Sequence, residues 1–405
     1  MKEYDIIIIG AGIAGLYTAY KIKKYYPEIT FVILESSPKK WIGGRMGSIN
    51  FHGTSVVTGA GIGRKKKDYL LIQLLHELHI KYGEFPIHHN FSDNLKDSCN
   101  VKKIFDYLKA KHPKRSIQKT FKDYAVSILG KDAYSLFVIC SGYSDYEKED
   151  SYDVLYHYEF DDNYSHGIGL SISWTKLVYS LVGKIGEKNI ITSCKVVKIL
   201  QNPDHLEIIS EKGRVFNSKK IIVATTINSV QKLLPKYTIY KDISAQPFLR
   251  LYGKFSKDSI PIMQKYVPCY TIVAGPLQKI IPMNPGEGIY MIAYSDNGSA
   301  KALKPYLENT SFNRRHLEYL LEKALSIPRG ELKLTSILPV YWDDGTHYYK
   351  PLSKDYSNRE EFIDVAQHPT DNILVVGEMV GLNQGWVEGA LDSVKKGLTK
   401  TWLES

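Results

Sequence analysis

Three glycines after a short apolar segment have the type and spacing needed to hold phosphate groups. Residues Tyr4–Ile9 have the β-branched composition of a strand that is buried on both faces. They are followed by Gly10, Ala11, Gly12, Ile13, Ala14 and Gly15. In such a motif the first glycine permits a tight turn, the second lets the backbone approach a pyrophosphate, and the third lets the next helix pack closely on the sheet. The free N–H groups at the start of that helix favour phosphate.

The segments after the glycines complete a dinucleotide-binding pattern. Residues 16–26 have a helix-forming composition that Pro27 ends, and Phe31–Leu34 predicts a second apolar strand. Glu35 follows this strand, twenty positions after Gly15, where a carboxylate can accept hydrogen bonds from a ribose diol. The alternative is a glycine-rich turn of an ordinary α/β protein, but here the strand, helix, strand and acid occur together. We therefore expect a bound adenine dinucleotide.

Composition and charge indicate a soluble protein of two or three domains. The chain has 405 residues and a net charge of +10, from 53 basic and 43 acidic side chains. The basic residues are scattered, and the densest group, residues 64–67, is interpreted as a solvated surface turn, so no nucleic-acid partner is expected. The chain begins with the first strand and contains no apolar run of about eighteen residues, so we expect no secretion signal and no membrane partner.

The cysteines favour a cytoplasmic protein without bound metal. The sequence places Cys99, Cys140, Cys194 and Cys269 far apart, without the paired spacing of a metal site. We expect all four to be reduced thiols. The sequence does not indicate an oligomeric state, and a homodimer is one option that it leaves open.

Two further glycine-rich stretches indicate contacts between the backbone and a flat ligand. Gly43 and Gly44 precede Arg45, whose planar guanidinium can donate to a phosphate oxygen. The second stretch comprises Gly59, Ala60, Gly61, Ile62 and Gly63.

These motifs resemble, in their order, the flavin-containing amine oxidase family, which includes the monoamine and polyamine oxidases. The resemblance continues at the other end of the chain, where Asn372–Glu378 and Gly385–Ser393 are similar to the closing signature of the family. That signature is a strand ending in Gly-Glu and a helix opening with an aromatic residue followed by Val-Glu-Gly-Ala. Two signatures at opposite ends, in the expected order, are much more specific than either one alone.

The resemblance implies an α/β fold with a Rossmann-type, NAD(P)-binding-like FAD domain and a discontinuous α+β substrate domain. The FAD domain would comprise residues 1–80, 190–245 and 338–405, and the substrate domain 81–189 and 246–337. Strands are predicted over 190–199, 206–210 and 219–226, and helices over 101–111, 116–129, 174–182 and 314–325.

The cofactor implied by the resemblance is FAD, bound without a covalent link. The residues expected to bind it are Gly10, Gly12, Ile13, Ala14, Gly15, Glu35, Gly43, Gly44, Arg45, Gly59, Ala60, Gly61, Ile62, Val196, Ala224, Thr225, Gly377, Glu378, Trp386 and Val387. The helix beginning near Val387 would direct its N–H groups at the N1/C2 carbonyl edge of the isoalloxazine and raise its potential. Glu388 either contacts the cofactor or serves only the helix dipole.

In the family, two aromatic rings flank the substrate amine and exclude water. Trp386 is the candidate for one wall, with packing in the core as the alternative. Residues 341–351 resemble a Gly-x-Tyr turn of the family, and Tyr348 is the candidate for the second wall, with Tyr349 next. His347 lies where some members carry a cysteine bonded to the flavin; we expect it to face solvent.

One departure from the family concerns the lysine that many members use to hold a water at flavin N5. The matching strand offers Arg250 instead. Arginine keeps its proton near neutral pH, so it could orient a water or a carboxylate but could not serve as a base. The expected catalytic residues are therefore Trp386, Tyr348 and Arg250.

The resulting hypothesis is an FAD-dependent, amine oxidase-like enzyme. A hydride equivalent would pass from a small-molecule amine to flavin N5, and O2 would reoxidise the flavin to give H2O2. Alternatives with the same fold are an amino-acid oxidase, a carotenoid desaturase or isomerase, and a protoporphyrinogen oxidase. A further alternative is a flavin-binding protein without turnover, in which side chains would block the pocket.

Overall fold

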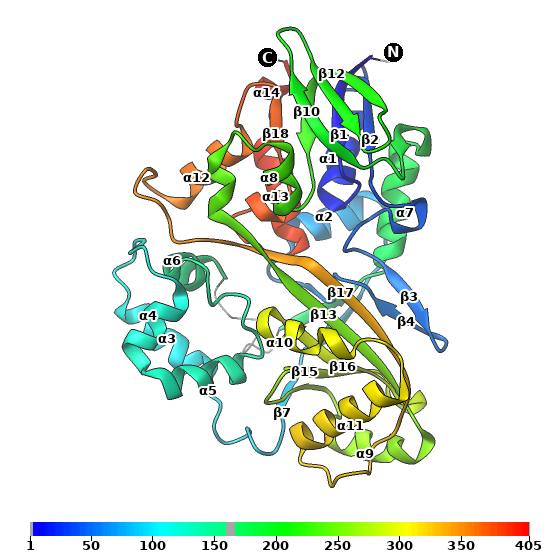
Figure 1. Ribbon diagram of the computed structural model, residues 1–405, viewed down its shortest axis with the longest axis vertical. Helices are drawn as coiled ribbons and strands as arrows, with labels where there is room; N and C mark the ends of the chain where they lie inside the picture. The colour runs from blue at the N-terminus through cyan, green and yellow to red at the C-terminus, as the bar shows by residue number, and fades with distance from the viewer. Residues whose placement is uncertain (1–2, 159–166, 405) are drawn as a thin grey trace.

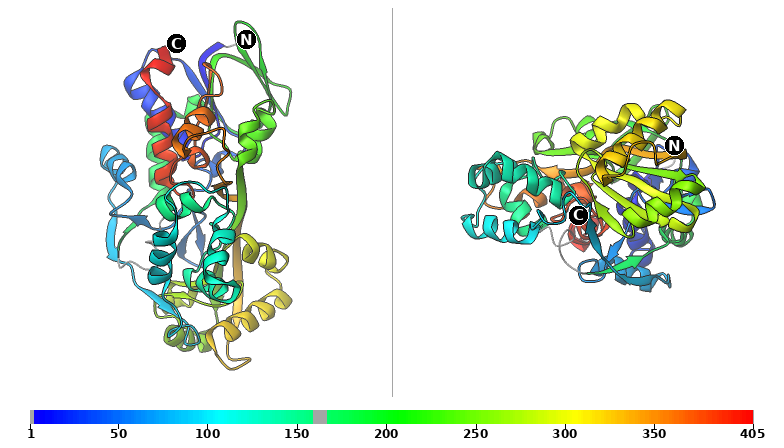
Figure 2. Two further views of the ribbon diagram at one scale, coloured as in Figure 1. Left: turned by 90° about the vertical axis from the view of Figure 1, so that its left-hand side faces the viewer. Right: turned by 90° about the horizontal axis from the view of Figure 1, so that it is seen from below.

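The computed structural model describes residues 3–158 and 167–404. Its long axis joins two halves, each built on one sheet, with a group of helices beside the second sheet (Figure 1). Figure 2 shows that β1 and α14 lie at the same end of the molecule. No helix in the described ranges is long and apolar enough to span a membrane.

The upper half contains a sheet of seven described strands in the order β10-β11-β12-β1-β2-β9, with β18 also pairing with β12. Strands β12 and β2 are parallel to β1, β18 is parallel to β12, and β9 is parallel to β2. Strand β11 is antiparallel to both of its neighbours, β10 and β12. Their bounds are β1 Glu3–Ile9, β2 Phe31–Leu34, β9 Ile190–Ile191, β10 Val196–Gln201, β11 Leu206–Ser210, β12 Val215–Val223 and β18 Ile373–Val375. The predicted strand over 190–199 is thus divided into β9 and β10.

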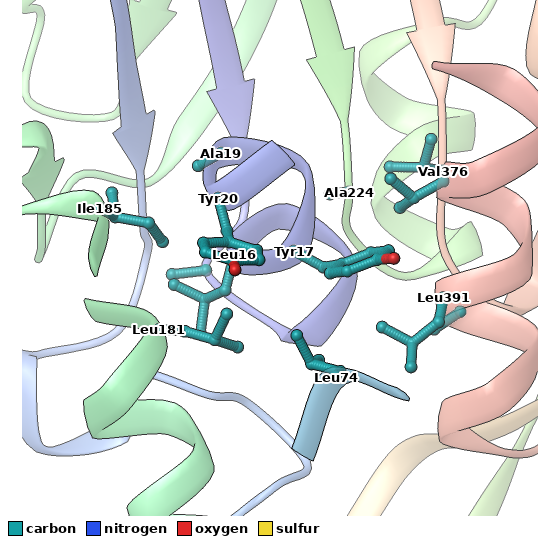
Figure 3. Packing of buried hydrophobic residues seen from close by; sticks show 14 of the residues in the cluster. Leu16, Tyr17, Ala19, Tyr20, Leu74, Leu181, Ile185, Ala224, Val376 and Leu391 are labelled. Carbon is teal, nitrogen blue, oxygen red and sulfur yellow. The ribbon is translucent and has the colours of Figure 1, made fainter. Parts of the chain in front are cut away.

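Strand β1 is buried on both faces, as its uninterrupted isoleucines predict. Ile6 and Ile8 belong to one hydrophobic core, and Ile7 and Ile9 belong to the core on the opposite face. On the first face, helix α1 (Ile13–Tyr25) contacts α7 (Trp174–Ile185) and α13 (Val387–Gly397). Figure 3 shows side chains of these helices meeting: Leu16, Tyr17 and Tyr20 of α1 with Leu181 and Ile185 of α7 and Leu391 of α13.

The lower half contains six described strands in the order β17-β13-β16-β15-β14-β7. They are antiparallel except for the pair β7 and β14. Their bounds are β7 His89–Phe91, β13 Ile243–Phe255, β14 Tyr270–Ile272, β15 Lys279–Asn284, β16 Ile289–Asp296 and β17 Leu334–Tyr349. Helices α9 (Ile260–Tyr266), α10 (Asn297–Leu303) and α11 (Ser311–Leu325) share a hydrophobic core with this sheet.

A separate helical group flanks this sheet (Figure 1). It consists of α3 Val101–Lys111, α4 Phe121–Leu129, α5 Lys131–Ser141, α6 Ser151–Asp153 and the π-helical segment η2 Val154–Tyr158, around its own aromatic core. Side chains at the N-caps define where two of these helices begin, because Asn100 accepts from the N–H of Lys103 and Thr120 from that of Asp123.

The remaining elements connect the two halves. The small strands are β3 Ser48–Phe51, β4 Thr54–Val57, β5 Gly63–Arg64, β6 Gly83–Pro86 and β8 Ile168–Ser171. The other helices are α2 Tyr69–Glu77, α8 Ile227–Leu233, α12 Arg359–Gln367 and α14 Lys400–Glu404. Short 3-10 segments are η1 Lys39–Trp41, η4 Glu187–Asn189, η5 Thr238–Asp242, η6 Lys257–Ser259, η7 Pro285–Glu287, η8 Lys304–Tyr306 and η9 Glu378–Val380.

Three sequence-based expectations differ from this architecture. Helix α7 lies within residues 81–189, which were assigned to the substrate domain, but it packs in the core around α1. Residues 341–349 form part of strand β17 rather than a turn, because they pair with β13. Cys99 and Cys140 form a disulfide, whereas Cys194 and Cys269 are free, so the expectation of four thiols is wrong.

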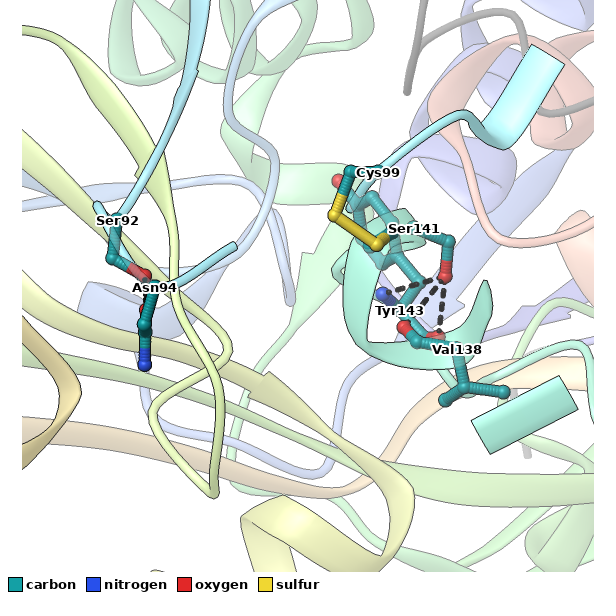
Figure 4. The surroundings of a disulfide bond; sticks show 7 residues. Ser92, Asn94, Cys99, Val138, Ser141 and Tyr143 are labelled. Atoms are coloured by element: carbon teal, nitrogen blue, oxygen red, sulfur yellow. Dashed lines mark hydrogen bonds between the residues drawn. A yellow bond between two sulfur atoms is a disulfide. The ribbon is translucent and has the colours of Figure 1, made fainter. Parts of the chain in front are cut away.

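The disulfide joins the end of helix α5, at Cys140, to Cys99 just before helix α3, and a turn follows α5 at this point. In this turn the Ser141 hydroxyl contacts the carbonyl oxygens of Val138 and Tyr143 at 2.9 and 3.0 Å (Figure 4). The sequence could not indicate the pairing, because the two cysteines are 41 residues apart and meet only when α3 and α5 pack together.

The glycines at the start of α1 are required by close packing. A Cβ on Gly15 would lie 2.0 Å from the carbonyl oxygen of Gly10. Gly10 itself has a φ of +108°, and a Cβ there would lie 2.3 Å from the carbonyl oxygen of Ala224. Backbone must therefore move if either residue gains a side chain.

We expect Gly15→Ala to lower the free energy of unfolding by about 1–3 kcal/mol, because the added methyl group would overlap the backbone of Gly10, which is itself packed against other backbone. Urea denaturation measures the change. Gly183→Ala in α7 is the matched control, because its Cβ would meet open space. That control should be neutral, or stabilising by up to about 1 kcal/mol through helix propensity. Equal effects of the two substitutions would contradict the packing argument.

The disulfide predicts a thiol count. Denatured protein that has not been exposed to a reductant should show two titratable thiols with a chromogenic disulfide reagent. The same protein should show four thiols after reduction. Cys140→Ser should lower the free energy of unfolding by about 2–4 kcal/mol, because the bond closes a long loop, while Cys269→Ser should not. Four thiols before reduction would contradict the bond.

Candidate active site

A cleft of about 2460 Å³ extends from the carboxyl end of β1 to the inner face of the lower sheet. Typical small-molecule sites measure about 300–1,000 Å³. The cleft therefore has room for a dinucleotide together with a second molecule.

The cleft brings together nearly all residues that the sequence assigned to a site. Its lining includes Gly10, Gly12, Ile13, Ala14, Glu35, Gly43, Gly44, Arg45, Gly59, Ala60, Gly61, Ile62, Val196, Ala224, Thr225, Arg250, Gly377, Glu378, Trp386 and Val387. Gly15 lies outside the lining because it packs against the carbonyl of Gly10. Tyr348 also lies outside it.

The three glycine-rich stretches of the N-terminal region lie against one another. The N–H of Gly43 donates to the carbonyl of Ala11 at 2.9 Å. A Cβ on Gly59 would lie 2.1 Å from the carbonyl oxygen of Arg45, whereas a Cβ on Gly12 would meet no atom within 4 Å. The backbone is thus packed tightly around an opening at Gly12, where the first turn of α1 begins. This opening could hold a pyrophosphate.

Glu35 is held in place by backbone donors at this end of the cleft. Its Oε2 accepts from the N–H of Ala11 at 2.7 Å, and its Oε1 accepts from the N–H of Ser37 at 2.7 Å. Each carboxylate oxygen has a second lone pair, so Glu35 could also accept from the hydroxyl groups of a ribose.

A second buried carboxylate, Glu378, joins its own segment, which includes Gly385, to the segments of Arg45 and His347. Its Oε1 lies 2.8 Å from Arg45 Nη1 and 2.6 Å from His347 Nδ1, and its Oε2 accepts from the N–H of Gly385 at 3.2 Å. Burial tends to raise the pKa of Glu378, but the electrostatic interactions with His347 and then Arg45, together with the hydrogen bonds from His347 and Gly385, outweigh it and lower the pKa to about 2. Glu378 is therefore ionised at neutral pH.

His347 is fully engaged rather than exposed to solvent. Its side chain is 0% exposed, and its Nε2 accepts from the N–H of Ile227 at 3.2 Å. This bond requires an unprotonated Nε2, so Nδ1 carries the hydrogen that is donated to Glu378. The expectation of a solvent-facing His347 is wrong, because β17 directs the side chain inward.

Trp386 lines the cleft with part of its surface and packs against the hydrophobic core with another part. Its indole N–H donates to Asp68 at 2.9 Å, and its ring lies 5.9 Å from that of Trp174. Asp68 also pairs with Arg64 at 2.8 Å. These contacts fix the orientation of the indole. Of the predicted solvated turn 64–67, Arg64, Lys66 and Lys67 line the cleft.

Glu388 has a role that neither sequence-based alternative describes. Its carboxylate accepts from the N–H groups of Leu70 and Leu71 at 2.7 and 3.0 Å. It therefore satisfies free donors at the start of helix α2 and joins α2 to α13.

The position of Tyr348 does not support its predicted role as the second aromatic wall. Tyr348 is buried beside β13, opposite Ser244, and is absent from the cleft lining. Phe248, Tyr294 and Trp342 line the cleft instead. Side chains alternate between the two faces of a strand, so Phe248, two residues before Arg250 on β13, lies on the same face as Arg250. This pattern could have identified Phe248 as a residue of the cleft.

Two acidic residues of the cleft were not predicted. Asp145 and Glu149 belong to an acidic stretch that resembles a solvated loop, and no sequence signal distinguishes them. Burial raises the pKa of Asp145, and burial together with nearby Asp153 raises the pKa of Glu149 well above its usual range. In the described ranges we find no group of three metal-ligating side chains.

The comparisons with known proteins support this arrangement. Residues 8–78 match the family described as an NAD(P)-binding Rossmann-like domain. An uncharacterised protein of Acanthamoeba polyphaga mimivirus is 20% identical over 98% of this chain and 94% of that protein. A putrescine oxidase variant with redesigned cofactor binding has a TM-score of 0.75 at 14% identity and 98% coverage of both chains. A second putrescine oxidase variant has a TM-score of 0.74 at 13% identity, with coverage of 100% of this chain and 99% of that chain. The fold implied by the sequence resemblance, that of a flavin amine oxidase, is confirmed.

The low pKa of Glu378 predicts how its contribution to stability depends on pH. Because its pKa is about 2 in the folded protein and ordinarily 4.5, the ionised group stabilises the fold above about pH 4.5, and this contribution is lost as the pH falls toward 2. Glu378→Gln should cost on the order of 2–3 kcal/mol at pH 7 and progressively less below pH 4.5, measured by urea unfolding.

The control for this prediction is Glu187→Gln, which removes an exposed carboxylate paired with Lys39. A surface pair contributes only about 0–1 kcal/mol. A loss in Glu378→Gln that is the same at pH 7 and pH 3 would show that the charge of Glu378 is not what stabilises the fold.

Proposed function

We propose that the protein is an FAD-dependent oxidoreductase of the amine oxidase type. The observation that carries the proposal is the opening at Gly12, formed by three glycine-rich stretches, beside two carboxylates already held by protein donors. The cleft continues from this opening to the inner face of the lower sheet, so a substrate can meet the cofactor.

The residues present fit FAD. Gly12 and the first turn of α1 would hold the pyrophosphate, Glu35 the adenosine ribose, and Val196 the adenine. Glu378 would accept from a ribityl hydroxyl through a remaining lone pair. The first turn of α13 begins after Trp386 in the cleft wall and would favour negative charge on the flavin ring.

The flavin is bound without a covalent link to His347 in this proposal. The supporting observation is that both ring nitrogens of His347 already have hydrogen-bond partners, Glu378 and the N–H of Ile227.

When bound, FAD accepts a hydride equivalent from the carbon next to the substrate nitrogen and is reoxidised by O2 to give H2O2. The chain supplies the environment for this step. Trp386, Phe248 and Tyr294 provide aromatic surface that excludes water from the reacting atoms. Arg250 stays protonated, so it can orient a substrate but cannot remove a proton. An open cleft also argues against the alternative of a structural flavoprotein with a blocked pocket.

The test begins with the visible spectrum of the purified protein after incubation with FAD. We expect an oxidised flavin band, with the flavin released into the supernatant by acid precipitation. Anaerobic addition of monoamines, diamines, polyamines and amino acids should bleach the band with one class, and peroxide should appear when air returns. A colourless protein that takes up no FAD would overturn the proposal, and a flavin that no amine reduces would refute the oxidase activity.

A further inference from the structure

Arg250 lies where the glycine-rich lining of the cleft meets the lower sheet. It belongs to β13, its residue is 5% exposed, and its side chain forms part of the cleft wall. A Cβ on Gly61 would lie 3.1 Å from Arg250 Nη2, so the guanidinium lies directly against glycine backbone. The guanidinium also lies over the ring of Tyr294, whose centre is 4.2 Å from Cζ.

The partners of this guanidinium do not balance its charge. Nη1 contacts the sulfur of Met291 at 3.7 Å, and Nε has no hydrogen-bond partner although it is buried. The hydroxyl of Tyr252 also interacts with Arg250, but it donates its own hydrogen to the carbonyl of Val57. Among residues 3–158 and 167–404, no carboxylate forms an ion pair with Arg250.

An unbalanced guanidinium is costly inside a protein. A buried lysine can lose its proton and so avoid the energetic cost of a buried charge. Arginine cannot lose its proton, so this cost remains. The cost is offset when an anion pairs with the planar donor fork, and a carboxylate matches that fork with two parallel hydrogen bonds. Since no carboxylate of the described residues pairs with Arg250, a ligand in the cleft could supply the anion.

We propose that Arg250 binds a carboxylate of the substrate, so that the substrate class is an amine that also carries a carboxylate, such as an amino acid. This inference rests on the proposed function, because it names the substrate of the same cleft.

The other charged groups near the site do not compete for this role. Lys279 Nζ lies 2.9 Å from the ring centre of Tyr143 and 4.2 Å from that of Tyr294, fully buried behind the aromatic wall. Asp296 is occupied by the backbone N–H and hydroxyl of Ser144 and the amide of Gln278.

The acidic side of the cleft is also compatible with an anion. Burial raises the pKa of Glu149 well above its usual range, which favours the neutral carboxyl form and weakens its repulsion of a carboxylate. The cleft lining also includes Lys66, Lys67 and Lys81. Their charges raise the local concentration of anions.

The test measures binding of benzoate, a carboxylate with no oxidisable amine, to the FAD-loaded protein. Benzyl alcohol is the uncharged ligand of similar shape. Titration is followed by the change in the flavin spectrum and by calorimetry. The variants are Arg250→Gln, which removes the charge, and Arg250→Lys, which keeps the charge but loses the fork. Lys254→Met is the matched control, because it removes a cation from the same strand that does not line the cleft.

We expect wild type and Lys254→Met to bind benzoate equally, and Arg250→Gln to bind it about 10- to 100-fold more weakly, since a hydrogen-bonded charge pair is lost. FAD content verifies the fold of each variant. If Arg250→Gln does not retain FAD, Arg250→Lys replaces it, with an expected loss of about threefold or more. Unchanged benzoate binding in the variant used overturns the inference, as does a wild type that binds benzoate no better than benzyl alcohol.

Failure of this inference is distinguishable from failure of the proposed function. If benzoate binding requires Arg250 but no amine reduces the flavin, the anion site stands and the oxidase proposal falls. If amines without a carboxylate reduce the flavin while benzoate does not bind, the oxidase proposal stands and the anion site falls.

Discussion

The structure depends on a point where three backbone segments touch. At Gly10 the end of β1 meets the carbonyl of Ala224 after β12 and the first turn of α1 at Gly15. This contact fixes the distance of α1 from the sheet, and with it the position of the N–H groups that face the opening at Gly12. The cores on both faces of β1 surround this point, so the geometry of the phosphate end is set by packing rather than by flexible side chains.

The same end of the cleft is closed by a charge network that joins segments far apart in the chain. Arg45 follows the second glycine-rich stretch, His347 belongs to the long strand β17 of the other half, and Glu378 follows β18. Because His347 comes from β17 while Arg45 and Glu378 belong to the dinucleotide-binding half, the complete set of bonds requires β17 to lie against that half. The ionised carboxylate therefore couples the dinucleotide-binding half to the lower sheet.

The sequence predicted features whose causes are local. The apolar run of β1, the strand Phe31–Leu34 and the helix Val101–Lys111 were found with correct bounds or nearly so, because periodicity and capping act over a few residues. Nearly all residues that the sequence assigned to a site also line the cleft, since glycines mark where backbone approaches a ligand. The placement of α7, the inward direction of His347 and the Cys99–Cys140 bond depend on tertiary packing, which no local pattern reports. Tyr348 was misjudged because residues 341–349 extend as a strand, so that neighbouring side chains point to opposite faces.

The two ends of the cleft differ in how their charges are balanced. At the dinucleotide end, Glu35 and Glu378 have protein donors on both oxygens, so their geometry does not depend on a ligand. At the other end, Arg250 has a sulfur, a phenol and an aromatic ring for neighbours, and burial raises the pKa of Glu149. A protein is stable with such groups only because the large cores elsewhere offset their cost. Where protein partners are complete, the fold determines what binds; where they are missing, the ligand must supply the complementary charge, and that requirement selects one ligand over another.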